Sequence, residues 1–259
     1  MSLDKVLAGR IALITGAAQG IGLAIATRLA ADGASVIIAD LNEAKAEEQA
    51  AELREHGYAA RGAPVDVADR ASVEMLSAKI GAVNILINNA GIYAETNLID
   101  CPEHVWRKSL EVNLFGAIHC IQVFGGAMVK GGWGRIINMG SLLSATAFGS
   151  DLGYVVSKTA LVGLTRSAAA EIARYGVTVN TICPGNILTD MMRELAPKIE
   201  QRDGLAPASF IRDRALAIPA RRLGDPEDIA AMAAFLCRDD AGYINGQSLH
   251  VNGGLLFNP

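Results

Sequence analysis

The chain has 259 residues, of which 51% are hydrophobic and 19% charged, and its net charge is −4. This composition supplies a large packed core and excludes an intrinsically disordered chain. An acidic chain without a basic stripe is poorly suited to nucleic acid or to an anionic membrane surface. The apolar runs are strand-sized and broken by glycine, and the N-terminal MSLDKVLAGR has no signal-peptide core. We therefore expect a cytoplasmic protein that does not span a membrane.

Cysteine and histidine are scattered along the chain. The four cysteines lack metal-type spacing and the four histidines do not pair at helical spacing, so no zinc site is predicted. Cys183 lies in the strand-like run VTVNTIC and Cys237 in the helix-like run IAAMAAFLC. Both patterns favour buried, reduced thiols over functional ones.

Short runs rich in β-branched residues alternate with longer segments of helical periodicity. Gly33 and Gly57 are placed to cap the C-terminal ends of two helical segments. The alternation predicts an α/β fold, a single doubly wound Rossmann-type domain over residues 1–259 with a parallel sheet and helices on both faces. The predicted strands are IALIT (from Ile11), SVIIA (from Ser35), AARGAPV (from Ala59), NILIN (from Asn84), GRIINMG (from Gly134), VTVNTIC (from Val177) and QSLHV (from Gln247).

Residues 189–222 interrupt this alternation. The segment contains Pro197, Pro207 and Pro219 and two short helical patterns, MMRELAPKI and SFIRDRALAI. A long excursion without strands in a compact domain is often a binding loop, so we expect a substrate lid here. A surface insertion without a role is the alternative.

A glycine-rich turn follows the first predicted strand. In TGAAQGIG, residues 15–22, Gly16 permits a tight turn, Gly20 allows close approach of a pyrophosphate, and Gly22 lets the next helix pack on the strand. The helix N-terminus then offers unpaired N–H groups to phosphate oxygens. Because strand, glycines and helix follow in the required order, the pattern predicts a dinucleotide site.

Asp40 ends the second predicted strand. A carboxylate at this position can accept hydrogen bonds from the adenosine ribose and repels a 2′-phosphate. Neither Leu41 nor Gln19 supplies a compensating positive charge. These residues favour NAD over NADP. Capping of the following helix is the structural alternative for Asp40, and it is compatible with ribose binding.

Tyr154 and Lys158 lie one helical turn apart on one face of a predicted helix. A free tyrosine has a pKa near ~10, and a neighbouring ammonium stabilises the phenolate. The Y-x-x-x-K pattern alone is weak, because such a pair is usually solvated surface. Ser141 strengthens it, since a hydroxyl at the carboxyl end of the predicted strand GRIINMG lies where open α/β sheets bind ligands, although serine also caps turns.

Together, TGAAQGIG, NNAG at 88–91, the serine before Y-x-x-x-K, and PGNILT at 184–189 resemble the short-chain dehydrogenase/reductase family. The resemblance extends from GRIALITG to the closing VNGG, where Asn252 replaces an aspartate of many relatives. It implies a seven-stranded parallel sheet and NAD-dependent hydride transfer between C4 of the nicotinamide and a carbonyl or secondary alcohol. The family is usually a tetramer joined by two long helices, here Pro102–Lys130 and Gly153–Tyr175, so we expect a homotetramer.

The resemblance also implies roles for the matching residues. Tyr154 is the expected general acid/base, Ser141 orients the reacting oxygen, and Lys158 lowers the tyrosine pKa and holds the nicotinamide ribose. Asn113, in EVNLFG, matches an asparagine that positions a water for proton relay. The other expected cofactor contacts are Gly16, Gln19, Gly20, Ile21 and Gly22 in the glycine loop; Asp40 and Leu41; Asp66 and Val67 beside the adenine; Asn89, Ala90 and Gly91; and Pro184, Gly185, Ile187 and Thr189 near the nicotinamide and phosphate.

The substrate pocket is expected between residues 141–154, Tyr93 and Ala94, and the segment after Thr189. That segment, up to RRLGDPEDIA, is more similar to polyol, sugar-alcohol and diol dehydrogenases of the family than to ketoacyl reductases, which favours a small polyol. Leu142 and Leu143 favour instead a less polar ketone or an aromatic alcohol. The candidate substrate contacts are Ser141, Leu143, Ser150, Asp151, Tyr154, Asn186 and Met191, with Leu142, Phe148 and Met192 as further apolar surface.

Other classes fit the sequence less well. The chain is too short for the second domain of a medium-chain zinc alcohol dehydrogenase and lacks a Cys/His cluster. An extended-type epimerase or dehydratase would share Y-x-x-x-K, but usually has a longer C-terminal domain. A non-catalytic NAD-binding sensor or scaffold is the remaining alternative, although such proteins tend to lose the tyrosine, lysine or serine that this chain retains.

Overall fold

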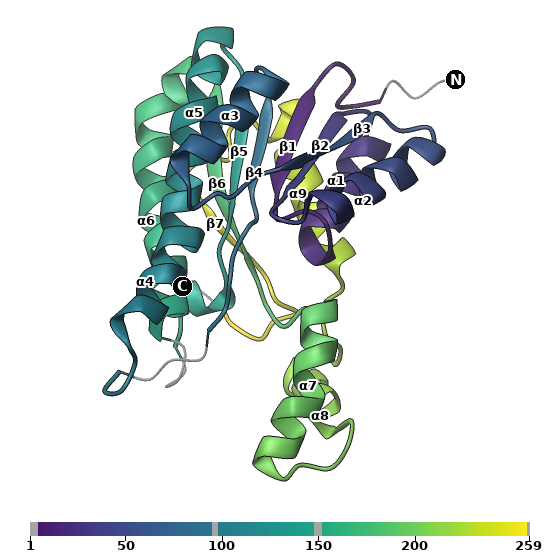
Figure 1. The fold of residues 1–259 in the computed structure, drawn as a ribbon, viewed down its shortest axis with the longest axis vertical. Helices are drawn as coiled ribbons and strands as arrows, with labels where there is room; N and C mark the ends of the chain where they lie inside the picture. The colour runs from purple at the N-terminus through teal and green to yellow at the C-terminus, as the bar shows by residue number, and fades with distance from the viewer. Residues whose placement is uncertain (1–4, 95–97, 148–151, 258–259) are drawn as a thin grey trace.

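Seven parallel strands form one sheet in the order β3-β2-β1-β4-β5-β6-β7 (Figure 1). The computed structural model describes residues 5–94, 98–147 and 152–257. Each strand falls on its predicted run to within a residue, which confirms the α/β fold class. The strands are β1 (Ile11–Thr15), β2 (Ser35–Asp40), β3 (Ala60–Pro64), β4 (Ile85–Asn88), β5 (Gly134–Met139), β6 (Val177–Pro184) and β7 (Ser248–Val251).

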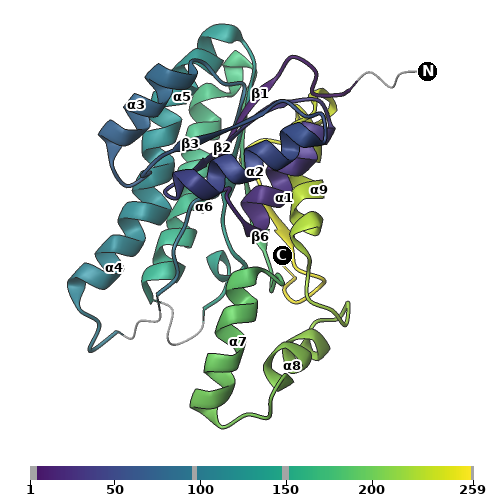
Figure 2. The same cartoon turned by 45° about the vertical axis from the view of Figure 1, so that its right-hand side comes forward.

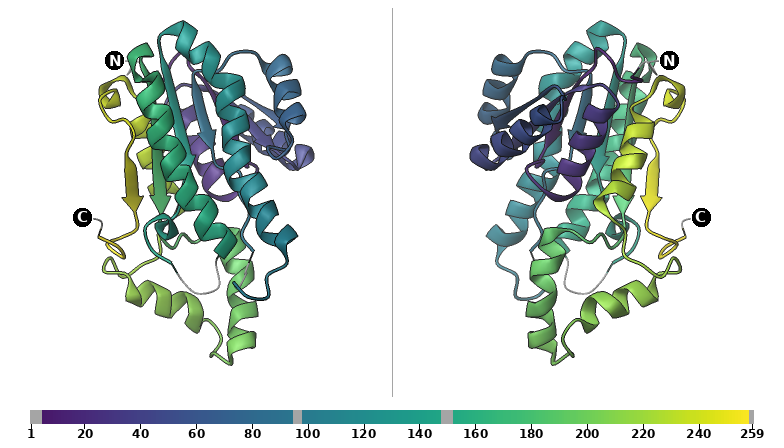
Figure 3. Two further views of the ribbon diagram at one scale, coloured as in Figure 1. Left: turned by 90° about the vertical axis from the view of Figure 1, so that its left-hand side faces the viewer. Right: turned by 90° about the vertical axis from the view of Figure 1, so that its right-hand side faces the viewer.

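Helices cover both faces of the sheet, as Figure 3 shows from the two sides. One face carries α1 (Gly20–Ala31), α2 (Glu43–Glu55) and α9 (Pro226–Leu236), and the other carries α3 (Arg70–Ile80), α5 (Gly116–Gly131) and α6 (Leu152–Ile172). Successive side chains of a strand therefore enter different cores. Ile14 packs on the α1 side and Leu13 on the α5 side, and both are fully buried.

The strand order reverses between β1 and β4, so the loops after these strands diverge at the carboxyl edge of the sheet. Ligands of open α/β sheets bind in the crevice at such a point. The predicted glycine loop follows β1 and the predicted NNAG run follows β4. The fold therefore brings these two motifs together.

The first predicted long helix is continuous over Glu103–Gly131 but is not uniform. It consists of α4 (Glu103–Leu110), a π-helical turn (Glu111–Phe115) and α5. By length and composition it is apolar enough to cross a membrane, since an 18-residue window within it has a mean hydropathy of 1.5. The sequence predicts apolar runs of strand length only, so this longer apolar stretch differs from the prediction. Cys120, Phe124 and Met128 are buried against the sheet, which explains the apolar composition of this face without a membrane.

The two helical patterns within 189–222 form α7 (Asp190–Asp203) and α8 (Ser209–Ala217). This hairpin extends beyond the carboxyl edge of the sheet (Figures 1 and 2). Its ends are joined at the base, because Leu188 N–H donates to Gly224 O at 2.8 Å and Gly224 N–H donates to Asn186 O at 2.9 Å. The excursion is thus closed on itself before the chain enters α9.

The cysteine prediction is confirmed. Cys183 and Cys237 are buried and unpaired. Burial raises the pKa of the Cys237 thiol to about 12, so this side chain stays protonated and acts as a small apolar group.

Candidate active site

One cavity of about 750 Å³ lies at the carboxyl ends of the strands. Its wall includes Asp40 and Leu41 after β2, and Tyr154 and Lys158 on α6. The cavity therefore joins the predicted nucleotide end to the predicted chemical end. Of the other predicted cofactor residues, its wall contains Gly16, Gln19, Gly20, Ile21, Asp66, Val67, Asn89, Ala90, Gly91, Pro184, Gly185, Ile187 and Thr189.

The glycine turn is held directly against the loop after β4. Gly16 has φ +62°, and a Cβ there would lie 2.7 Å from the Cα of Ala90. Thr15 Oγ1 accepts the N–H groups of Asn89 and Ala90 at 3.1 Å. Substitution of Gly16 would therefore push apart the two loops that form the floor of the cavity.

Gly22 is the exception among the predicted cofactor contacts, because it is buried behind the cavity wall. A Cβ at Gly22 would lie 2.5 Å from Asn89 Nδ2 and 2.6 Å from Gly16 O. It serves the close packing of helix on strand rather than direct contact with a ligand.

The N-terminus of α1 is open to an anion. Gln19, the residue at the N-cap, makes no side-chain capping bond, whereas Asn42 and Asp69 cap α2 and α3. The first amide groups of α1 therefore lack a side-chain acceptor and lie beside Gly20 on the cavity wall. This donor set fits the pyrophosphate of a dinucleotide.

The carboxylate of Asp40, the predicted ribose ligand, is held by two backbone amides. Its Oδ2 accepts the N–H of Ala18 at 3.1 Å and its Oδ1 accepts the N–H of Asn42 at 3.0 Å. Both carboxylate oxygens are thus oriented by backbone, and each retains a lone pair for a ribose hydroxyl.

Lys45 is a residue of this region that sequence reasoning missed. Its Nζ donates to Gln19 Oε1 at 2.6 Å, so a cation lies beside the cavity wall where only neutral side chains were expected. Its position in the first turns of α2, just after Asp40, was visible in the sequence. Its reach to the glycine loop depends on how α2 packs beside α1.

The chemical end consists of Tyr154, Lys158 and Ser141, which line the same cavity. Lys158 Nζ lies 5.6 Å from the centre of the Tyr154 ring and donates to Met139 O at 2.7 Å. Burial lowers the pKa of Lys158 to about 8, because the ammonium is removed from water. The Tyr93 ring lies edge-on to the Tyr154 ring, with their centres 5.5 Å apart.

Asn113 lies in the π-helical turn and is buried behind the wall rather than on it. Its Oδ1 accepts the N–H of Ile92 at 2.8 Å, and its Nδ2 donates to Ile92 O and to Ser157 Oγ, both at 3.0 Å. Asn113 therefore joins the loop after β4 to α6. π-turns of this kind often occur at functional sites.

Leu143, expected as an apolar substrate contact, and its neighbour Leu142 lie behind the cavity wall. Leu142 and Leu143 are 7% and 8% exposed and do not line the cavity. Ser141 Oγ accepts the N–H of Leu143 at 3.1 Å and starts a 3₁₀ turn in which both leucines are buried.

The other predicted substrate contacts divide into two groups. Asn186 lines the cavity, as does Met192. Phe148, Ser150, Asp151 and the side chain of Met191 lie outside the described residues. The wall further contains Met139, Gly140, Ile92, Lys108, Glu111, Val112 and Asp190, which the sequence did not single out.

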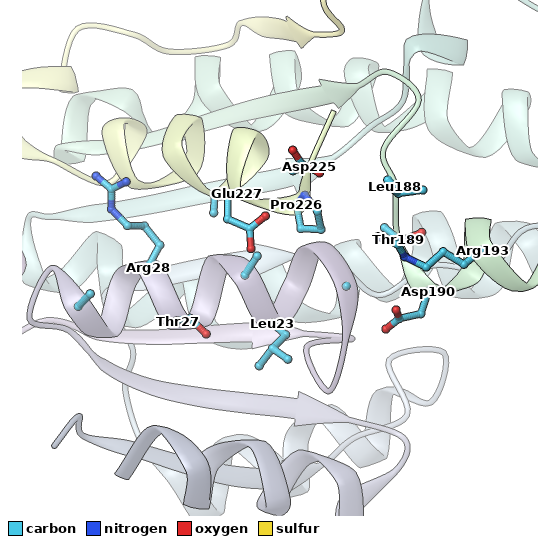
Figure 4. Close-up of a pocket in the computed structure, with 14 residues that line it drawn as sticks. Leu23, Thr27, Arg28, Leu188, Thr189, Asp190, Arg193, Asp225, Pro226 and Glu227 are labelled. Atoms are coloured by element: carbon cyan, nitrogen blue, oxygen red, sulfur yellow. The ribbon is translucent and has the colours of Figure 1, made fainter. Parts of the chain in front are cut away.

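A second, more open cavity of about 600 Å³ lies between α1, α9 and the start of α7 (Figure 4). It shares Gly20 and Thr189 with the first cavity, but Ser141, Tyr154 and Lys158 do not line it. Arg28 in this groove is paired with Asp32 at 3.1 Å. The candidate chemistry therefore lies in the first cavity.

The comparisons with known proteins agree with this geometry. The family model described as enoyl-(acyl carrier protein) reductase matches residues 16–256. The 3-oxoacyl-(acyl-carrier-protein) reductase FabG of Haemophilus influenzae is 40% identical over 251 residues, covering 95% of this chain and 98% of the relative.

Two solved structures share the whole fold. A structure from Agrobacterium tumefaciens, provisionally assigned as a gluconate dehydrogenase, superposes with a TM-score of 0.91 at 32% identity and covers all of both chains. A gluconate 5-dehydrogenase from Burkholderia cenocepacia, in complex with NADP and tartrate, gives a TM-score of 0.87 at 36% identity and covers 98% of each chain. With a family model matched over residues 16–256 and a FabG relative 40% identical over 95% of the chain, the chain belongs to the short-chain dehydrogenase/reductase family of oxidoreductases.

Proposed function

We propose that this protein interconverts a secondary alcohol and a ketone with a nicotinamide cofactor, using Tyr154 as the general acid/base. The observation that carries the proposal is that Ser141, Tyr154 and Lys158 line one cavity with the glycine loop and Asp40. A sensor or scaffold has no need to keep a phenol, an ammonium and a hydroxyl together at the end of a dinucleotide site.

The residues divide the chemistry between them. The bound nicotinamide supplies the hydride acceptor at C4. Tyr154 takes the proton of the substrate hydroxyl during oxidation and returns it during reduction. Ser141 donates a hydrogen bond to the same oxygen, and the Lys158 ammonium stabilises the phenolate. Thr189 and Ile187 would hold the nicotinamide end, and the open amides of α1 the pyrophosphate.

We further propose that NAD is preferred over NADP. Asp40 is positioned by two backbone amides to accept hydrogen bonds from ribose hydroxyls, and its charge opposes a 2′-phosphate. The Burkholderia relative was solved with NADP, so the preference is expected to be quantitative rather than absolute.

For the substrate we propose a small polyhydroxylated molecule, a sugar alcohol or the corresponding sugar acid. Leu142 and Leu143, the residues that favoured an aromatic alcohol, are buried and do not line the cavity, while Ser141, Asn186 and Asp190 offer polar groups on the wall. The gluconate 5-dehydrogenase relative supports a hydroxy acid, and the FabG relative supports a 3-oxoacyl thioester as the competing class.

The test is hydride turnover with NAD and NADP against sugar alcohols, sugar acids, aromatic alcohols and a 3-oxoacyl thioester. Turnover is followed at the absorbance band of the reduced nicotinamide. We expect Tyr154→Phe to lower kcat by about 10²- to 10⁴-fold while cofactor affinity is kept, because only proton transfer is lost. Unchanged turnover in Tyr154→Phe would rule out the mechanism. Cofactor binding without turnover on every substrate would favour a sensor.

We also propose a cytoplasmic homotetramer assembled through the helix over residues 103–131 and α6. Phe115 on the π-helical turn and Val156 on α6 are 48% and 42% exposed in the single chain. These apolar side chains lie on the helices that the family resemblance assigns to the subunit interface.

A further inference from the structure

Lys45 brings a positive charge to the end of the cavity that also carries Asp40. Its ammonium donates to Oε1 of Gln19, a residue of the cavity wall, at 2.6 Å. The side chain is half-buried, and among the residues that the structure describes its one hydrogen-bonding partner is this neutral amide. Lys45 is therefore not neutralised by a carboxylate, unlike Arg28 on α1 and Arg54 on α2, which pair with Asp32 and Glu47.

The backbone of Lys45 is tied to Asp40 by a short chain of hydrogen bonds, while its ammonium is held by Gln19. Asn42 N–H donates to Asp40 Oδ1 at 3.0 Å, and the Asn42 side chain accepts the N–H of Lys45 at 3.1 Å. Because Asn42 is the N-cap of α2, the first turn of this helix is tied to the end of β2. The carboxylate and the ammonium thus reach the adenosine end from two neighbouring elements.

We propose that Lys45 provides the counter-charge for the 2′-phosphate of NADP, so that the chain accepts NADP as a second cofactor beside NAD. The proposal rests on the dinucleotide site of the proposed function. Exchange of a neutral amide for a phosphate oxygen gives the ammonium a charge-assisted hydrogen bond. The carboxylate of Asp40 repels the same phosphate, so Lys45 strengthens NADP binding and Asp40 weakens it. NAD has no 2′-phosphate, and its ribose hydroxyls would bind Asp40.

The test measures binding rather than turnover. Dissociation constants of NAD, NADP, ADP and 2′,5′-ADP are determined by titration calorimetry for the wild type, Lys45→Gln and the matched control Lys79→Gln. Lys79 is an exposed lysine in the last turn of α3, so its replacement makes the same charge change away from the cavity. Thermal melting curves confirm that each variant is folded.

We expect Lys45→Gln to weaken NADP and 2′,5′-ADP by about 5- to 10-fold, with NAD and ADP changed by less than about twofold and Lys79→Gln without effect. Raising the salt concentration should weaken NADP more than NAD in the wild type, and this difference should shrink in Lys45→Gln. Equal effects on phosphorylated and unphosphorylated ligands, or no effect, would overturn the proposal.

The result for Lys45 does not depend on the proposed catalytic role of Tyr154 or on the proposed preference for NAD. Loss of turnover on every alcohol would leave these binding constants measurable. A wild type that binds NADP more tightly than NAD would refute the NAD preference, while the ratio between wild type and Lys45→Gln would still decide the role of Lys45.

Discussion

Lys158 is buried on the wall of the cavity, in an environment unlike that of a free lysine side chain. Its Nζ donates to Met139 O at 2.7 Å, and burial lowers its pKa to about 8. The pKa of a lysine in the unfolded chain is near ~10.4. The folded protein therefore gives up this proton at a pH where the unfolded chain still holds it.

This difference predicts how stability depends on pH. Below pH ~8 Lys158 is charged in both states and the cost of burying the charge is fully present. Between pH ~8 and ~10.4 the unfolded state binds more protons, so stability rises with pH. We expect the melting temperature of the cofactor-free wild type, relative to Lys158→Met, to increase across this interval, with the exposed Lys198→Met as a control without such a trend. A pH-independent difference between wild type and Lys158→Met would contradict the burial of a charged lysine.

The proposed preference for NAD over NADP also depends on a single residue, Asp40. Asp40→Ala combined with Leu41→Arg removes the opposing carboxylate and adds a guanidinium for a 2′-phosphate. We expect the ratio of kcat/KM for NADP to that for NAD to rise by at least about 10-fold, since a hydrogen bond between charged groups is worth roughly 1.5–3 kcal/mol. Leu41→Met serves as the control. Equal use of NAD and NADP by the wild type would contradict the proposed preference for NAD.

At the scale of elements, the α7–α8 hairpin depends on one buried carboxylate. Glu200 on α7 is 8% exposed and accepts the N–H groups of Ala208 at 3.0 Å and Phe210 at 2.9 Å. These two amides lie at the start of α8, where the chain passes through a left-handed Ala208. Glu200 therefore supplies the hydrogen-bond acceptors that an N-cap side chain would otherwise supply to α8.

We expect Glu200→Ala to loosen the hairpin without unfolding the sheet. Two amides lose their acceptor, at a cost of about 1–3 kcal/mol each if they remain buried. Amide hydrogen exchange over residues 208–217 should accelerate and KM for the substrate should rise, while exchange in β1 and β4 stays slow. Glu194→Ala, an exposed position on α7, is the control. Unchanged exchange in α8 would show that Glu200 does not hold the hairpin.

Elements were predictable from the sequence where a single local rule decides them. β1 (IALIT) is a buried run of apolar residues, β5 (GRIINM) is buried along its whole length, and burial on both faces explains why neither strand alternates between polar and apolar residues. The π-helical turn was not predictable, because it is stabilised by Asn113 bonding across to Ile92 and Ser157. The inward turn of Leu143 likewise depends on Ser141 capping a 3₁₀ turn, which periodicity does not reveal.

The site was predictable to the extent that its residues lie in motifs of known order. Gly16, Asp40, Tyr154 and Lys158 follow strands or share a helix face, so the parallel sheet places them at one edge. Lys45 could not be found this way, because its contact with Gln19 joins residues 26 positions apart on two helices. Such a contact depends on how α2 packs beside α1, and the pattern of residues along the sequence does not specify this packing.

At the scale of the whole molecule, the proposed tetramer predicts a response to a single surface charge. Phe115→Asp places a carboxylate on the exposed apolar face of the helix over residues 103–131. We expect the particle mass, measured by light scattering after size exclusion, to fall from four chains to fewer, because an unpaired charge is costly in an apolar interface. Met75→Asp on α3, where the side chain is 66% exposed, makes the same charge change outside the proposed interface. A wild type with the mass of one chain would refute the tetramer.

The hydrogen bonds between residues 186–188 and Gly224 have a consequence for the history of such a chain. Because they close the excursion where it leaves the body, insertions, deletions and exchanges within it need not strain β6, α9 or the position of Tyr154. The segment can therefore change in sequence and length as a self-contained unit. Ser141, Tyr154 and Lys158 lie outside it and keep their positions.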